Sequence, residues 1–156
     1  MKVFKYEKSL HQYLSRMTTL FLQRIESSTS SGIPDVYYAF SKNNHSYCGW
    51  LEYKVVASDR VSLDVFGKEQ CGWARRHKQH GGSTVACIGV ASGIIMMIEM
   101  NTLMPLLEEQ VSLTKLFLLQ QKGVLRKDDF CVINVFRDLV DVSVLSFLQQ
   151  LKGTDQ

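Results

Sequence analysis

Two acidic residues and a lysine in the first part of the chain have the types and spacing needed for chemistry at a metal ion. Glu52 and Lys54 lie two residues apart in a strand-like apolar run, so their side chains face the same way. Asp35 lies 17 residues before Glu52, just ahead of another strand-like run, and a hairpin would bring it back beside Glu52. Converging carboxylates repel each other unless a cation lies between them, and Mg²⁺ prefers oxygen ligands. The pattern therefore predicts a divalent-metal site.

Each fragment alone also has a plainer interpretation. Glu52 and Lys54 could form a surface ion pair on a half-exposed strand, which is common and contributes little energy. The Pro34-Asp35 dipeptide is typical of a turn or of the start of a strand. Together, however, the residues favour a site that holds an ion and an attacking water against a phosphodiester.

A helix is predicted over residues 68–80, because a pair of glycines ends the segment. Gln70 and Trp73 fall on one face of it, although packing in the core is the simpler interpretation of Trp73. The second half of this helix is basic, which is typical of a solvated face near the C-terminal dipole or of phosphate contacts. The candidate residues for contacts with nucleic acid are Arg60, Lys68, Arg75, Arg76 and Lys78.

The ordered set of fragments over about residues 20–90 resembles the VRR-Nuc branch of the PD-(D/E)XK nuclease superfamily. That branch is related to Holliday-junction resolvases and to small phage endonucleases. The matching fragments are Gly32-Ile33-Pro34-Asp35, Glu52-Tyr53-Lys54, Gln70-Cys71-Gly72-Trp73 and the stop Gly81-Gly82.

The resemblance implies a role for each residue of the site. Asp35 and Glu52 would ligate Mg²⁺ (or Mn²⁺), joined by the backbone carbonyl of Tyr53. Lys54 would orient or deprotonate the attacking water and stabilise charge on the phosphate. Gln70 would contact the metal site or the scissile strand.

The first predicted helix spans about residues 7–26. Glu26, near its end, corresponds in position to an acidic residue that many members of the family place beside the metals. A hairpin of strands 36–40 and 47–56 follows, with a polar loop of about five or six residues. The later predictions are strands at 84–90 and 94–100, a helix from Pro105 to about 121, a strand-like segment at 130–136 and a helix at about 142–151.

The expected fold class is α/β, with a restriction-endonuclease-like (PD-(D/E)XK) core, a mixed central sheet flanked by helices, and extra C-terminal helical elements. The 156 residues are 46% hydrophobic and 21% charged, as in an ordinary globular protein with one domain. Residues 1–100 would form the nuclease core. Residues 101–156 would be an extension that packs on the core or mediates dimerisation.

Charge and cysteine content bear on the partner and the compartment. The net charge is +3, with the basic excess in residues 1–99, which fits a polyanionic partner or an ordinary mixed surface. The four cysteines lack zinc-binding spacing and predict free thiols in a reducing compartment. We expect no membrane association, because no apolar run is long enough to span a bilayer. The predicted location is the cytoplasm of a bacterial cell, with a cellular or a phage gene.

The function expected first is that of a Mg²⁺-dependent endonuclease. It would hydrolyse phosphodiester bonds in DNA, select branched or junction structures, and act as a homodimer. A nucleic-acid-binding module on a nuclease fold, with little turnover, is an alternative, because a fold alone does not establish activity. A structural or interaction protein with coincidental motifs is another.

Overall fold

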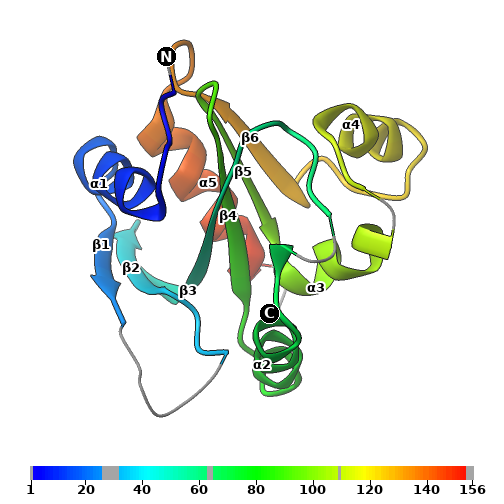
Figure 1. Cartoon of the computed structure of the whole chain (residues 1–156). Helices are drawn as coiled ribbons and strands as arrows, with labels where there is room; N and C mark the ends of the chain where they lie inside the picture. Colours follow the sequence, from blue (N-terminus) through cyan, green and yellow to red (C-terminus); the bar gives the residue numbers. More distant parts are fainter. Residues whose placement is uncertain (1, 26–31, 63–64, 109, 154–156) are drawn as a thin grey trace.

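The computed structural model describes residues 2–25, 32–62, 65–108 and 110–153. A six-stranded sheet runs through its centre with the strands in sequence order (Figure 1). Only β3 and β4 pair in parallel, and α2 connects them. The strands are β1 (Phe21–Arg24), β2 (Val36–Lys42), β3 (His45–Val56), β4 (Thr84–Val90), β5 (Ile94–Glu99) and β6 (Phe130–Asn134). The helices are α1 (Glu7–Met17), α2 (Lys68–Gln79), α3 (Met100–Leu103), the 3-10 helix η2 (Met104–Glu108), α4 (Leu113–Gln121) and α5 (Val140–Gly153).

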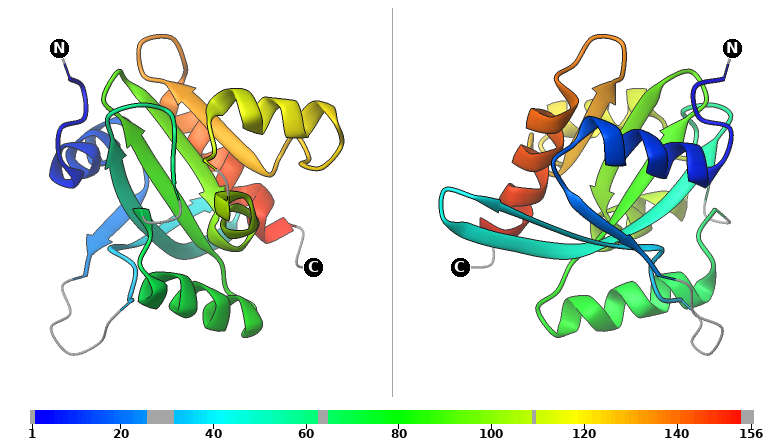
Figure 2. Two further views of the ribbon diagram at one scale, coloured as in Figure 1. Left: turned by 45° about the vertical axis from the view of Figure 1, so that its right-hand side comes forward. Right: turned by 90° about the vertical axis from the view of Figure 1, so that its left-hand side faces the viewer.

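The sheet separates two hydrophobic layers. On one face, α1 and α5 pack through residues such as Leu10, Leu14 and Phe147. On the other face, α2, α3 and α4 pack through residues such as Ala74 and Leu116 (Figure 2). The expected α/β class, with a mixed sheet flanked by helices, is confirmed. None of the described helices is long and apolar enough to cross a membrane.

The hairpin of β2 and β3 is tighter than predicted. Asn43 and Asn44 form a two-residue turn with φ of 53° and 64°, the left-handed region that asparagine tolerates. Such turns match the natural twist of paired strands. The flanking polar residues therefore extend the ladder, with Lys42 opposite His45, and the expected loop of five or six residues is wrong.

The prediction of one helix over residues 7–26 is also wrong. Helix α1 ends at Met17, and Thr18 is extended, with its hydroxyl donating to the carbonyl of Leu14 at 2.6 Å. The next residues pair with β2 as strand β1. The apolar residues after Met17 fit a helical period and a strand equally well, and pairing with β2 decides between them.

The C-terminal part belongs to the same sheet and the same two layers. Strand β6 pairs with β5, and α5 packs on the face that α1 covers. The predicted helix from Pro105 to 121 is instead divided into η2 and α4. Val111 forms a bridge with Val61, and the Ser112 side chain caps α4 by accepting from the Lys115 amide. The strand at 130–136 and the last helix are confirmed within a few residues.

Candidate active site

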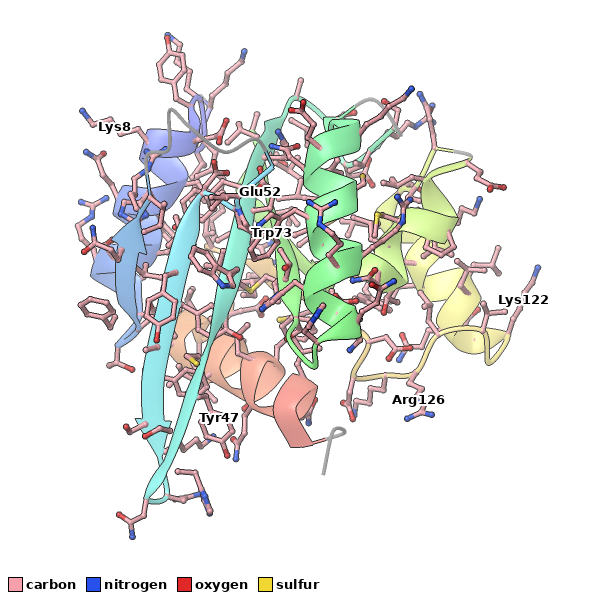
Figure 3. The ribbon with its side chains drawn as sticks, turned by 90° about the horizontal axis from the view of Figure 1, so that it is seen from below. Lys8, Tyr47, Glu52, Trp73, Lys122 and Arg126 are labelled. Carbon is pink, nitrogen blue, oxygen red and sulfur yellow. The ribbon has the colours of Figure 1, made fainter. Side chains whose placement is uncertain are left out.

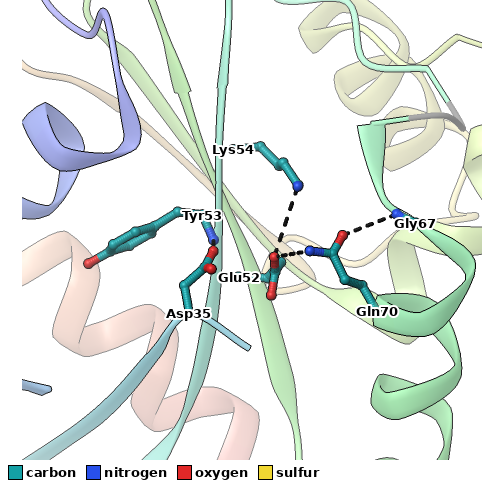
Figure 4. A network of polar contacts seen from close by, with 6 residues as sticks. All are labelled: Asp35, Glu52, Tyr53, Lys54, Gly67 and Gln70. Carbon is teal, nitrogen blue, oxygen red and sulfur yellow. Dashed lines mark hydrogen bonds and ion pairs between the residues drawn. The ribbon is translucent and has the colours of Figure 1, made fainter. Parts of the chain in front are cut away.

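Strand pairing places Asp35 beside the middle of β3. Asp35 precedes β2, whose first residue Val36 lies opposite Leu51. The backbone amide of Tyr53 donates to Asp35 Oδ2 at 2.9 Å, which fixes the carboxylate against β3 (Figure 4). The backbone carbonyl of Asp35 accepts from the amide of Ile25 at 2.8 Å, so the end of β1 also holds it.

Gly32 allows the segment before Asp35 to lie against the start of α2. Its φ is +86°, and a Cβ there would overlap the backbone carbonyl of Glu69. Only glycine accepts both the left-handed conformation and this close approach without strain. The glycine of the Gly-Ile-Pro-Asp fragment thus brings the Asp35 segment and the Gln70 helix together.

Glu52 is held from α2 and faces Lys54. Its side chain is only 2% exposed. Gln70 Nε2 donates to Glu52 Oε1 at 2.6 Å, while Gln70 Oε1 accepts from the amide of Gly67 at 3.1 Å. Lys54 Nζ lies 4.0 Å from the same Glu52 oxygen and 5.7 Å from the centre of the Phe66 ring. One amide side chain therefore orients the glutamate and joins it to the helix N-terminus.

Burial and a neighbouring acid raise the pKa of the Glu52 carboxyl. Burial raises the pKa of the Glu52 carboxyl to about 8, the Asp35 carboxylate adds to this rise, and the Lys54 ammonium opposes it. Because adjacent carboxylates repel each other, the protonated form of Glu52 is favoured when no cation lies between the two side chains. We call Asp35 and Glu52 the acid pair. It provides oxygen donors that suit a hard divalent cation.

A third acid, Glu7, approaches the acid pair from α1. Burial raises the pKa of Glu7, and the adjacent Asp35 carboxylate raises it further, while Lys54 and Arg24 oppose the rise. Among the described residues, no group of three or more acidic, histidine or cysteine side chains converges closely enough for direct ligation of one ion. Glu7 therefore lies next to Asp35 at the edge of the site rather than in a closed cage of ligands.

Sequence reasoning missed Glu7 because the first helix was predicted to be too long. With the helix extended to residue 26, the acidic residue that the family resemblance implies corresponds to Glu26 at its end. Glu26 itself lies outside the described residues, so its role stays a prediction. The signal that could have identified Glu7 is its place in the helix. Between the start of α1 and its end at Met17, Glu7 is the only acidic residue.

The ring of Tyr53 joins α1 to the strand that carries Glu52. It points to the opposite face of β3, where it is fully buried. Its hydroxyl lies 2.8 Å from His11 Nδ1, and burial lowers the pKa of His11, with Arg24 adding to the effect. The contact fixes α1, and with it Glu7, relative to the backbone of Tyr53.

The structure brings four of the predicted site residues together, and it places the predicted nucleic-acid contacts outside this centre. Asp35, Glu52, Lys54 and Gln70 meet across β2, β3 and α2 (Figure 4). Tyr53 contributes its backbone between them. The predicted nucleic-acid contacts Arg60, Lys68, Arg75, Arg76 and Lys78 are all exposed, the first in a loop and the rest on α2.

Comparison with known proteins supports the fold. No protein-family model matches the chain, and no curated protein matches its sequence. Among solved structures, it is similar to Hjc, a Holliday junction resolvase from the archaeal hyperthermophile Archaeoglobus fulgidus. The TM-score is 0.50 at 11% sequence identity, over 72% of this chain and 90% of the Hjc chain. At this identity the similarity concerns the fold alone. The chain has a restriction-endonuclease-like fold, and assignment to the VRR-Nuc branch stays a prediction.

Proposed function

We propose that the chain is a Mg²⁺- or Mn²⁺-dependent endonuclease that hydrolyses phosphodiester bonds in DNA. The observation that carries the proposal is the acid pair, in which Glu52 is buried and Asp35 is half-buried, with Lys54 Nζ 4.0 Å from Glu52. Two carboxylates and a lysine on one sheet face form a common arrangement for metal-assisted hydrolysis. The restriction-endonuclease-like fold supports the same class of reaction, as an analogy.

Asp35, Glu52 and the backbone carbonyl of Tyr53 would hold the ion. When bound, the ion would supply Lewis-acid charge stabilisation and a more acidic water. The Tyr53 amide keeps Asp35 against β3, and Gln70 keeps Glu52 turned toward the site. Lys54 would place its ammonium beside the scissile phosphate or the attacking water, where it can stabilise negative charge as it develops.

The proposed substrate is branched or junction DNA. Exposed Arg75, Arg76 and Lys78 lie on the second half of α2, where they could contact phosphates without reading sequence. The name of the structural neighbour, a Holliday junction resolvase, supports the choice of junction DNA. We propose a homodimer as the active form, because a four-way junction presents two symmetry-related strands.

The test is cleavage of a labelled four-way junction and of supercoiled plasmid, with Mg²⁺, with Mn²⁺ or with EDTA. We expect metal-dependent nicking that is lost in Asp35→Asn and in Glu52→Gln, both of which preserve side-chain shape. Glu69→Gln is the matched control, because this exposed acid lies on α2 beside Gln70 but outside the site. Metal-dependent nicking that survives both site substitutions would contradict the assignment.

Two other results would favour the alternative functions. Tight, salt-sensitive DNA binding without nicking in any divalent metal would indicate a binding module on a nuclease fold. No heat of Mn²⁺ binding by calorimetry, together with no affinity for DNA, would indicate a structural or interaction protein.

A further inference from the structure

An unbroken row of rings crosses β1, β2 and β3 and continues onto α2. The aromatic row consists of Phe21, Tyr37, Trp50, Trp73 and His77. Along the row, the distances between neighbouring ring centres are 6.4, 5.7, 5.7 and 4.8 Å. The first three contacts are edge-to-face, so the edge of one ring packs against the face of its neighbour.

The aromatic row lies directly beside the acid pair. Tyr37 is two residues after Asp35, and Trp50 is two residues before Glu52, so each ring shares a sheet face with the adjacent acid. Tyr37 and Trp50 are opposite each other in the β2–β3 register. Trp73 packs against Trp50 from α2, and Figure 3 labels Trp73 and Glu52 in the region between β3 and α2. A strand of nucleic acid whose phosphate is at the acid pair would therefore pass over these rings.

These rings are not core residues. Phe21 is 57% exposed, and the other four are half-buried, whereas Tyr38 and Tyr53 on the opposite face are 0% exposed. The hydrophobic cluster on this side of the sheet includes no described residue of β1 or β2. A shallow hollow of about 370 Å³, partly lined by Phe21 and Tyr37, lies at the outer end of the row. Aromatic ring surface is thus exposed to solvent where the helical layer ends.

The surroundings of the aromatic row suit a polyanion. Between the acid pair and the hairpin turn, the side chains on this face of β1, β2 and β3 include no carboxylate. At the other end of the row, a hollow of about 230 Å³ is lined by Trp73, His77, His80 and Arg76. Exposed Arg75 and Lys78 lie on the same helix. Exposed aromatic rings that lie beside both the acid pair and basic residues match the chemistry of an unpaired DNA strand. Such a strand offers bases that stack on rings and phosphates that pair with cations.

We propose that the aromatic row is a stacking platform for a single-stranded DNA segment that leads into the acid pair. The inference rests on the proposed function and narrows its substrate to DNA with an unpaired stretch beside the scissile phosphate. Bases of a continuous duplex are stacked on one another and cannot lie on the rings. Stacking tolerates any base, so the platform selects structure rather than sequence.

The chain provides its own reporter for the test. Both of its tryptophans, Trp50 and Trp73, belong to the aromatic row. Stacked bases should quench tryptophan fluorescence during titration in EDTA, where no cleavage occurs. The probes are a fluorescein-labelled oligothymidylate of about 20 nucleotides and a blunt duplex of the same length. We expect the single strand to bind more tightly and to quench, and the duplex to cause little quenching.

Two substitutions remove rings without removing the reporter. Phe21→Ala and Tyr37→Leu should each weaken oligothymidylate binding by roughly tenfold and leave its salt dependence unchanged. Phe136→Ala is the matched control, because Phe136 is 74% exposed and outside the row. Arg76→Gln should instead weaken binding and reduce the salt dependence. Urea unfolding of each variant establishes that the fold is intact.

Several results would overturn the platform. These are wild-type affinity in folded Phe21→Ala and Tyr37→Leu, equal quenching by the duplex, or no binding of either probe. A concentration-dependent dimer in sedimentation that these substitutions abolish would assign the row to a second copy of the chain. Absence of nicking in Mg²⁺ and Mn²⁺, with ring-dependent binding retained, would refute the nuclease proposal and leave the platform standing.

Discussion

Replacing Glu52 by glutamine should stabilise the metal-free protein while it abolishes cleavage. The side chain is buried beside Asp35, and its pKa is raised from an ordinary 4.5 to about 8. In the glutamine variant, the side-chain oxygen can still accept from Gln70 and the amide can donate to Asp35. The substitution therefore resembles a permanently protonated glutamate.

The size of the expected gain in stability follows from the difference in the pKa of Glu52 between the folded and the unfolded state. Because the folded state binds the proton more tightly, stability contributed by Glu52 is complete below about pH 4.5 and is lost as the pH rises toward 8. At pH 7, about 2.5 pH units above the ordinary pKa, the loss is as much as about 3 kcal/mol at roughly 1.4 kcal/mol per unit. Glu52→Gln should recover this amount, which corresponds to roughly 6–12 °C in Tm for a chain of this size.

Urea unfolding of the wild type and of Glu52→Gln in EDTA, at intervals from pH 4 to pH 8, measures the effect. The two proteins should have similar stability at pH 4 and diverge as the pH rises, while the exposed control Glu69→Gln follows the wild type. Mn²⁺ at pH 8 should stabilise the wild type more than the glutamine variant, because binding to the folded state alone shifts the unfolding equilibrium. An equal or lower stability of Glu52→Gln at pH 7 and pH 8 in EDTA would refute this account of the buried Glu52 carboxyl.

Three other substitutions test the framework of the site. Glu7→Gln should leave the fold intact and lower metal-dependent cleavage by roughly 10–100-fold, because Glu7 contacts Asp35; unchanged initial rates on junction DNA would exclude this role. Gly32→Ala should lower the free energy of unfolding by about 1–2 kcal/mol for its left-handed backbone alone, which urea unfolding would measure. It should also reduce cleavage in nicking assays, because it displaces the segment before Asp35. Gly49→Ala should cost about 1–3 kcal/mol, since its Cβ would lie 2.7 Å from the Tyr38 hydroxyl, and wild-type stability in urea would contradict the packing.

The local sequence was sufficient to predict that Asp35, Glu52 and Lys54 lie together. Alternation along a strand places Glu52 and Lys54 on one face whatever the strand packs against. A hairpin then returns Asp35 to them within a short stretch of chain, and the error in the length of the turn did not alter that outcome. The helix that carries Gln70 was predicted to within a residue, because its glycine stop is a local signal.

Contacts between distant segments decided what the sequence could not. Apolar residues after Met17 suit a helix or a strand, and only pairing with β2 made them β1. The packing of α1 brings Glu7, which local spacing did not indicate, next to Asp35, and the His11–Tyr53 contact helps to hold it there.

The aromatic row likewise depends on contacts between distant segments rather than on local sequence. Each ring is unremarkable in its own segment, and Trp73 alone suggested core packing. The row exists because the strand register places Tyr37 opposite Trp50 and because α2 packs Trp73 against it. The sequence by itself determined which groups could perform the chemistry, since their spacing is local. Only the tertiary structure decided which other groups surround them, because register and helix packing depend on contacts between residues far apart in the chain.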